Sequence, residues 1–115
     1  MNVRFADQAI RCRILRAELD QLLSGRALEL EVALPHGHVF RVNVRGTALG
    51  GWRLDSDPTG LWISVPRAAL DALVEKLPSK EGIGEDFESS HGRVRVSLEV
   101  DLKDKKRTRA AAASG

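Results

Sequence analysis

The chain repeats one pattern twice, in residues 10–23 and again in residues 61–74, which align without a gap 51 positions apart. Each copy begins with three alternating apolar residues and continues with Arg-Ala-x-Leu-Asp-x-Leu. The spacing of apolar residues changes from two to about 3.6 at the same place in both copies, as in a strand that runs into an amphipathic helix. A strand–helix pattern made twice predicts an internal duplication.

Alternating apolar and polar residues extend each copy into a unit with two strands before the helix and two after it. Such alternation is typical of strands with one buried and one wet face. Because the connections within each unit are short, we expect neighbouring strands to pair antiparallel. The predicted strands cover residues 3–5, 10–14, 28–34, 40–44, 52–54, 61–65, 83–88 and 94–102.

Two helices are expected, over residues 16–24 and 67–77. Their apolar residues recur at helical spacing, so we expect Leu19 and Leu70 to face the sheet and Glu18 to face water. The sequence therefore predicts an α+β fold with two internally duplicated ββαββ units. These units would form either one pseudo-twofold antiparallel sheet or a partly open barrel, with two helices.

The length of 115 residues fits one domain. We expect a single α+β domain over residues 1–102, with one repeat at about 2–45 and the other at about 52–102. Residues 103–109 hold five basic residues and one acidic residue, a balance of +4, so a total of +2 leaves −2 for the rest of the chain. Residues 103–115 are expected to form a basic, disordered tail.

The cysteine count and the short apolar segments of the sequence predict a cytoplasmic protein that does not bind a membrane. The chain has one cysteine, Cys12, so it cannot form an internal disulfide, and this is usual in a reducing compartment. Its first residues contain no apolar stretch typical of a signal peptide. No segment approaches the roughly 20 apolar residues that a membrane-spanning helix needs.

Residues 4–19 read Arg-Phe-Ala-Asp-Gln-Ala-Ile-Arg-Cys-Arg-Ile-Leu-Arg-Ala-Glu-Leu. This stretch resembles the opening of a small family of uncharacterised bacterial proteins, a domain of unknown function. In that family a strand ends in a short turn, and an Ile/Leu-Arg-x-Arg-Leu strand then enters a helix through a Thr or Ser cap. Leu15 stands at the cap position here. The resemblance agrees with the predicted fold and implies no activity, substrate or cofactor.

Residues that commonly carry catalysis or bind metals form no recognisable pattern. His36, His38 and His91 lie in predicted turns, whereas a metal site needs three or four converging ligands. Cys12 falls on an inward strand face without a nearby base, which predicts a buried and inert thiol. The glycine pairs do not match a phosphate-binding loop. We therefore expect no catalytic residue, metal or cofactor, and the sequence identifies no small-molecule ligand.

Arginines are the candidate interaction residues, because Arg4, Arg11, Arg13, Arg41 and Arg45 all fall opposite apolar positions in the first copy. Trp62 occupies the position equivalent to Arg11 in the second. Such a sheet face could bind an acidic partner or stack against a nucleic-acid strand. The alternative is that the arginines pair with Glu29 and Glu31 across the sheet, which requires no ligand. The predicted interaction surface consists of Arg11, Arg13, Arg41 and Trp62.

Three classes of function remain open from the sequence. The leading interpretation is a non-enzymatic interaction or regulatory module that binds a protein partner or a second copy of itself. The alternative is an RNA- or DNA-binding domain that uses the arginine-rich sheet face and the basic tail. A small enzyme ranks third, because no set of nucleophile, base and orienting group can be assembled from the sequence.

Overall fold

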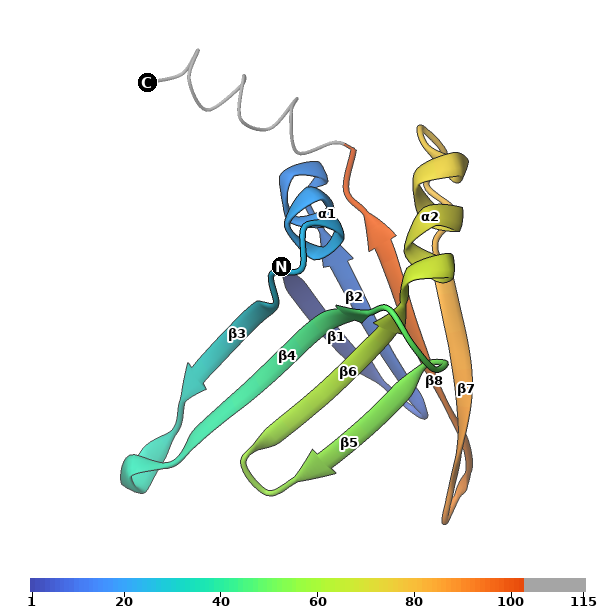
Figure 1. The fold of residues 1–115 in the computed structure, drawn as a ribbon. Helices are drawn as coiled ribbons and strands as arrows, with labels where there is room; N and C mark the ends of the chain where they lie inside the picture. The colour runs from blue at the N-terminus through green and yellow to red at the C-terminus, as the bar shows by residue number, and fades with distance from the viewer. Residues whose placement is uncertain (103–115) are drawn as a thin grey trace, which may run out of the picture.

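The computed structural model describes residues 1–102, and the predicted basic tail at 103–115 lies outside the described residues. The described part contains two helices and two four-stranded sheets (Figure 1). The elements are β1 (Asn2–Ala6), β2 (Ala9–Ile14), α1 (Arg16–Leu23), β3 (Leu28–Ala33), β4 (Val39–Thr47), β5 (Arg53–Asp57), β6 (Gly60–Pro66), α2 (Arg67–Lys76), β7 (Ile83–Ser89) and β8 (Gly92–Val100), with one 3-10 turn at Pro35–Gly37.

The order of these elements confirms the predicted α+β class and the predicted strands and helices. Both helices begin at the arginine of the repeated motif, and they end within a residue of the predicted position. Gly25 follows α1 with φ +92°, a conformation in which glycine is favoured because it has no Cβ. Within residues 1–102, neither helix is long and apolar enough to cross a membrane.

The predicted single antiparallel sheet is wrong, because the strands form two separate mixed sheets. Sheet A has the order β1-β2-β8-β7, and sheet B has the order β3-β4-β6-β5. Each hairpin pairs its own strands antiparallel, as a tight turn requires. The hairpins then join through the parallel pairs β2–β8 and β4–β6. Strands β2 and β8 lie far apart in the chain, and β5 lies between β4 and β6, so no short turn constrains the direction of either pair. Neither sheet closes into a barrel.

One cluster of buried apolar side chains packs between the inner faces of the two sheets and beneath both helices. Leu19 of α1 and Leu70 of α2 are completely buried, as predicted from the helical spacing. The two helices contact each other and lie at the same end of the sheets (Figure 1). The core therefore contains residues from both halves of the chain. The outer face of each sheet points away from the core.

Candidate interaction surface

The four residues of the predicted interaction surface belong to two different sheets. Arg11 and Arg13 lie on β2 in sheet A, whereas Arg41 lies on β4 and Trp62 on β6 in sheet B. Each alternates with buried residues of its own strand, so each lies on the outer face of its sheet. The arginines of β2 and the outward tryptophan therefore do not form one continuous sheet surface.

We call the outer face of sheet A the arginine face. In its register Arg4 of β1 lies directly opposite Arg11 of β2, and Arg13 lies opposite Glu99 of β8. Like charges that face each other across a strand pair destabilise a sheet unless an anion compensates them. The outward-facing side chains of its strands include three carboxylates, Asp86, Glu88 and Glu99, and five arginines, Arg4, Arg11, Arg13, Arg93 and Arg95.

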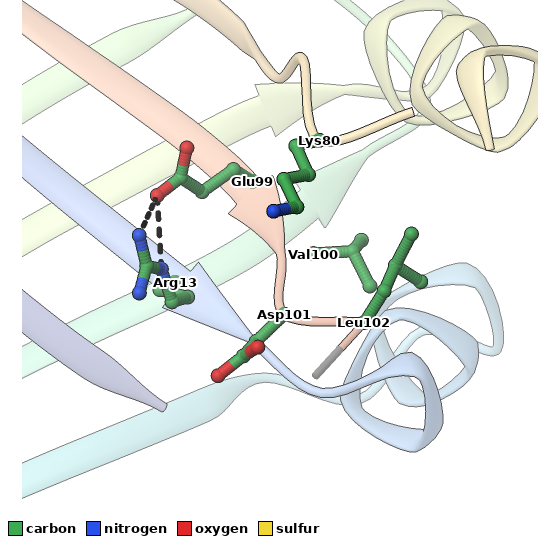
Figure 2. Close-up of a pocket in the computed structure, with 6 residues that line it drawn as sticks. All are labelled: Arg13, Lys80, Glu99, Val100, Asp101 and Leu102. Carbon is green, nitrogen blue, oxygen red and sulfur yellow. Dashed lines mark hydrogen bonds and ion pairs between the residues drawn. The ribbon is translucent and has the colours of Figure 1, made fainter. Parts of the chain in front are cut away.

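Glu99 is shared by two of these arginines. Its Oε1 accepts hydrogen bonds from Arg13 Nε at 3.0 Å (Figure 2) and from Arg11 Nη2 at 3.3 Å. The Glu99 side chain is 19% exposed and that of Arg11 is 50% exposed, so solvent screens the pairs only in part. One carboxylate compensates two guanidinium groups here, which leaves positive charge at the surface.

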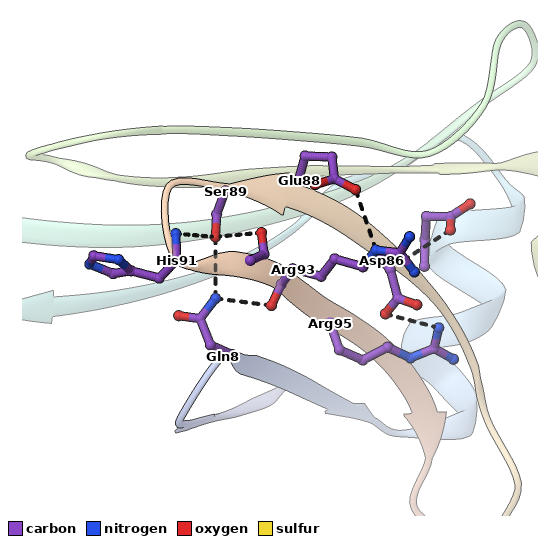
Figure 3. Close-up of polar contacts among 9 residues, drawn as sticks. Gln8, Asp86, Glu88, Ser89, His91, Arg93 and Arg95 are labelled. Atoms are coloured by element: carbon purple, nitrogen blue, oxygen red, sulfur yellow. Dashed lines mark hydrogen bonds and ion pairs between the residues drawn. The ribbon is translucent and has the colours of Figure 1, made fainter.

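The other two ion pairs of the arginine face lie near the turn that joins β7 and β8. Arg95 lies 3.5 Å from Asp86 and Arg93 lies 3.3 Å from Glu88, between side chains that are largely solvated (Figure 3). The Arg95 guanidinium also crosses over Gly84, where an added Cβ would lie 2.8 Å from Arg95 Nη2. Gly84 therefore leaves room for an arginine of the neighbouring strand.

The turn of the β1–β2 hairpin is held by its neighbours in sheet A. Gln8 Nε2 donates hydrogen bonds to Ser89 Oγ at 3.2 Å and to the Arg93 carbonyl at 2.9 Å (Figure 3). The Gln8 carbonyl in turn accepts a bond from the Arg95 N–H at 2.9 Å. These contacts fix the hairpin against β8, although β1 itself lies at the edge of the sheet.

Arg4 differs from the other arginines of the face. Among residues 1–102 it makes no hydrogen bond or ion pair, and its cross-strand neighbour on β2 is Arg11. A cavity of about 240 Å³ is lined by Arg4 and Arg13 and also by the carboxylates of Glu18 and Asp101. A smaller cavity of about 110 Å³ adjoins the other side of Arg13 (Figure 2).

The outer face of sheet B has a different chemistry. Arg41 Nε lies 3.1 Å from Glu31 Oε2 and 3.8 Å from Glu29 Oε1. Pairing with these two glutamates, the ligand-free alternative considered for the arginines, therefore occurs for Arg41, while the arginines of β2 use Glu99. Trp62 is half-buried, lies outside the core cluster and stands in register between Asn43 and Asp55.

The cysteine and the histidines, the residue types that commonly act as nucleophiles or metal ligands, lie apart from one another. Cys12 is 1% exposed, and burial raises the pKa of its thiol to about 11, which suppresses the reactive thiolate. His36, His38 and His91 are exposed in turns of two different sheets. Within residues 1–102, no group of three or more His, Cys, Asp or Glu side chains could hold a metal ion.

A more apolar cavity of about 430 Å³ lies between the start of α1 and the end of α2. Leu15, Leu77 and Leu102 form part of its wall, and Leu102 is the last described residue. The chain continues from the edge of this cavity, so we place no ligand site there.

Comparison of the chain with family models, curated proteins and solved structures found no match. The arginine face is therefore the candidate functional site of the described residues.

Proposed function

We propose that this protein is a non-enzymatic interaction module that binds an acidic segment of a protein partner on the arginine face. The proposal depends on one observation: Arg4, Arg11 and Arg13 occupy adjacent strands, and Arg11 and Arg13 share the single carboxylate of Glu99. Guanidinium groups bind carboxylates through paired, charge-assisted hydrogen bonds. An acidic segment would supply the anions that these arginines lack.

A protein partner is favoured over RNA or DNA, which remains the alternative. Binding of a single strand without sequence preference usually combines a cationic groove with aromatic rings that stack on the bases. Trp62 lies in the other sheet from Arg11 and Arg13, so it cannot stack bases beside them. Outside residues 103–109 the chain carries a balance of −2, which is unfavourable for a long phosphate backbone.

A different protein is favoured over a second copy of this chain as the partner. On sheet B, Glu29 and Glu31 already bond Arg41, and Asp55 bonds Arg53 at 2.9 Å. These carboxylates would have to break their own pairs to reach the arginine face of a second copy. A partner with unpaired acidic residues has no such cost.

The remaining parts of the proposal rest on local chemistry. A non-enzymatic role is supported by Cys12, whose burial suppresses nucleophilic reactivity. We also propose a cytoplasmic location, which the single cysteine supports. Membership of the family of uncharacterised bacterial proteins stays a prediction from residues 4–19.

We further infer that the two halves arose by duplication and are related by a pseudo-twofold axis. Positions in the first hairpin and helix of each half differ by 51, and positions in the second hairpin differ by 54. The parallel pairs agree with these offsets, because Ile10 lies opposite Val96 while Leu61 lies opposite Val42. The Gln8 carbonyl bonds the Arg95 N–H at 2.9 Å, and the Thr59 carbonyl bonds the Arg41 N–H at the same distance.

The duplication bears on function because the two outer faces differ in chemistry. If both faces bound the same ligand, equivalent positions would carry similar side chains. Instead the equivalent positions on sheet B lack the three arginines, which supports binding on sheet A alone. The positions equivalent to Arg4, Arg11 and Arg13 hold Asp55, Trp62 and Ser64.

Fluorescence anisotropy with the full chain tests the proposal, using a labelled oligoglutamate peptide and a labelled single-stranded DNA. We expect the peptide to bind and the affinity to fall as salt is added, because exposed charges are screened. The double variant Arg11→Ala/Arg13→Ala should lose this binding. The matched control Arg41→Ala, on sheet B, should keep it.

A second protein variant separates the arginine face from residues 103–109. Replacing the five basic residues of that segment by serine should leave peptide binding unchanged. DNA binding that survives this replacement and disappears with Trp62→Ala would favour the nucleic-acid alternative. Peptide binding lost with the tail and retained in the Arg11→Ala/Arg13→Ala variant would refute the proposed site.

A further inference from the structure

We propose that the acidic partner binds as an extended strand added to the outer edge of β1, with acidic and apolar side chains in alternation. This inference rests on the proposed function and specifies how the partner is held. It joins three features of one short strand: an unpaired backbone edge, an unpartnered cation on one side and an exposed phenylalanine on the other.

The backbone of β1 is available along one edge. β1 is the first strand in the order of sheet A and pairs with β2 alone. In an antiparallel pair, alternate residues turn their N–H and C=O groups away from the partner strand. Four of the five residues of β1 are exposed. An unpaired edge of this kind is a ready template for another strand.

The two sides of β1 present different chemistry to such a strand. Arg4 points to the outer face without a partner among the described residues. Phe5 lies on the other side of the strand and is 59% exposed, an unusual state for a large apolar side chain. Side chains of an added strand would alternate between these sides. An acidic residue would meet Arg4, and an apolar residue would meet Phe5.

The other edge strands lack this combination. On β3, Glu31 bonds Arg41 at 3.1 Å. On β5, Arg53 bonds Asp55 at 2.9 Å within the same strand. On β7, Asp86 and Glu88 bond the two arginines of β8. The arginine and the acidic residues named on these edges already have partners, and none of the three strands carries an unpaired arginine or lysine among the described residues, so an acidic strand would gain less from joining them.

Arg4 also determines which strand can be added. It is the central residue of β1, so antiparallel pairing with β1 of a second copy would bring two Arg4 side chains close together. Directly opposed like charges disfavour that pairing. The same position attracts a carboxylate, and Arg11 on the adjacent strand adds to the attraction. The occupant is therefore an acidic strand of another protein.

Three synthetic peptides of about six residues, a common strand length, test the inference against the full chain. One alternates glutamate with valine. The second has the same composition with its glutamates and valines in separate blocks. The third has the alternating sequence but carries methyl groups on the backbone nitrogens that would face β1. Dissociation constants and the hydrogen exchange of the β1 amides are measured with each peptide.

We expect the alternating peptide to bind about tenfold more tightly than the methylated one, because at least two backbone hydrogen bonds are lost. The β1 amides should exchange more slowly only with the alternating peptide. Equal binding by all three peptides would overturn strand addition and leave the arginine face intact as a binding surface. No binding by any peptide, oligoglutamate included, would overturn the proposed function as well.

Variants of Arg4 provide the second readout. Arg4→Ala should weaken binding of the alternating peptide about tenfold, through loss of a charge-assisted hydrogen bond. The matched control Arg53→Ala, on edge strand β5, should bind as the unmodified chain does. Arg4→Glu should prefer a peptide that alternates lysine with valine. If Arg4→Glu keeps its preference for the acidic peptide, Arg4 does not select the partner and the inference is wrong.

Discussion

Glu18 accepts the backbone N–H of Leu15, which precedes α1 and has no side-chain oxygen to cap the helix. Its Oε1 accepts the Leu15 N–H at 2.9 Å, and its Oε2 lies 2.7 Å from the amino group of Met1. The first N–H groups of a helix have no partner within it, and a glutamate at the third helical position commonly reaches back to satisfy one. The sequence-based expectation that Glu18 faces water is therefore wrong, because the side chain is only 17% exposed.

Replacing Glu18 by alanine should lower the free energy of unfolding by about 1 kcal/mol, the typical loss for a helix cap. Chemical denaturation measures this, with Glu75→Ala as the control. Glu75 is an exposed residue of α2, and its substitution should change stability by less than about 0.5 kcal/mol. Equal effects of the two substitutions would show that the Glu18 contact does not stabilise α1.

Cys12 makes stability depend on pH in the alkaline range. The ordinary pKa of the thiol is 9.0, and burial raises it to about 11 in the folded chain. Between these values the unfolded chain loses the proton while the folded chain keeps it, so the contribution of Cys12 to stability is complete below pH 9.0 and falls as pH rises. The fall should be on the order of 3 kcal/mol.

Denaturation curves across this pH range, for the unmodified chain and for Cys12→Ala, measure that fall. Cys12→Ala removes the titrating group, so its stability should change less between the two pH values. The same pH dependence in both proteins would assign the effect to other groups.

At the scale of strands and helices, the periodicity of apolar residues was sufficient to predict where the helices and strands lie and which of their faces are buried. Leu19 and Leu70 recur at helical spacing and are buried, and Val42 and Val96 alternate with exposed residues on their strands. The association of the hairpins was not predictable in this way. Alternation defines which face of a strand is buried, whereas the pairing of β2 with β8 depends on contacts between distant parts of the chain.

The burial of Leu19 and Leu70 predicts a large loss of stability when either side chain is truncated. Leu19→Ala and Leu70→Ala should each lower the free energy of unfolding by about 2–5 kcal/mol, because each leaves a cavity under a helix. The exposed residue Gln21 of α1 is the control, and Gln21→Ala should have an effect within about 0.5 kcal/mol. Chemical denaturation that gives equal losses for all three variants would contradict the assigned helix faces.

At the scale of the whole molecule, the candidate site was predictable only in part. Arg11 and Arg13 were identified correctly as outward residues of one strand. Their separation from Trp62 follows from the division into two sheets, and their shared acid, Glu99, lies 86 or more positions away in the sequence. The unpartnered state of Arg4 depends on the same long-range pairing. No local pattern in the sequence carries that information.

The arginine face is the central claim, and NMR mapping of the full chain during titration with the oligoglutamate peptide tests it most directly. The backbone amides of Arg4, Arg11 and Arg13 should shift, and those of Arg41 should not. The indole N–H of Trp62, which belongs to sheet B, provides an internal reference and should also stay unchanged. Shifts that centre on Trp62 and Arg41, or an absence of shifts in β1 and β2, would contradict the account.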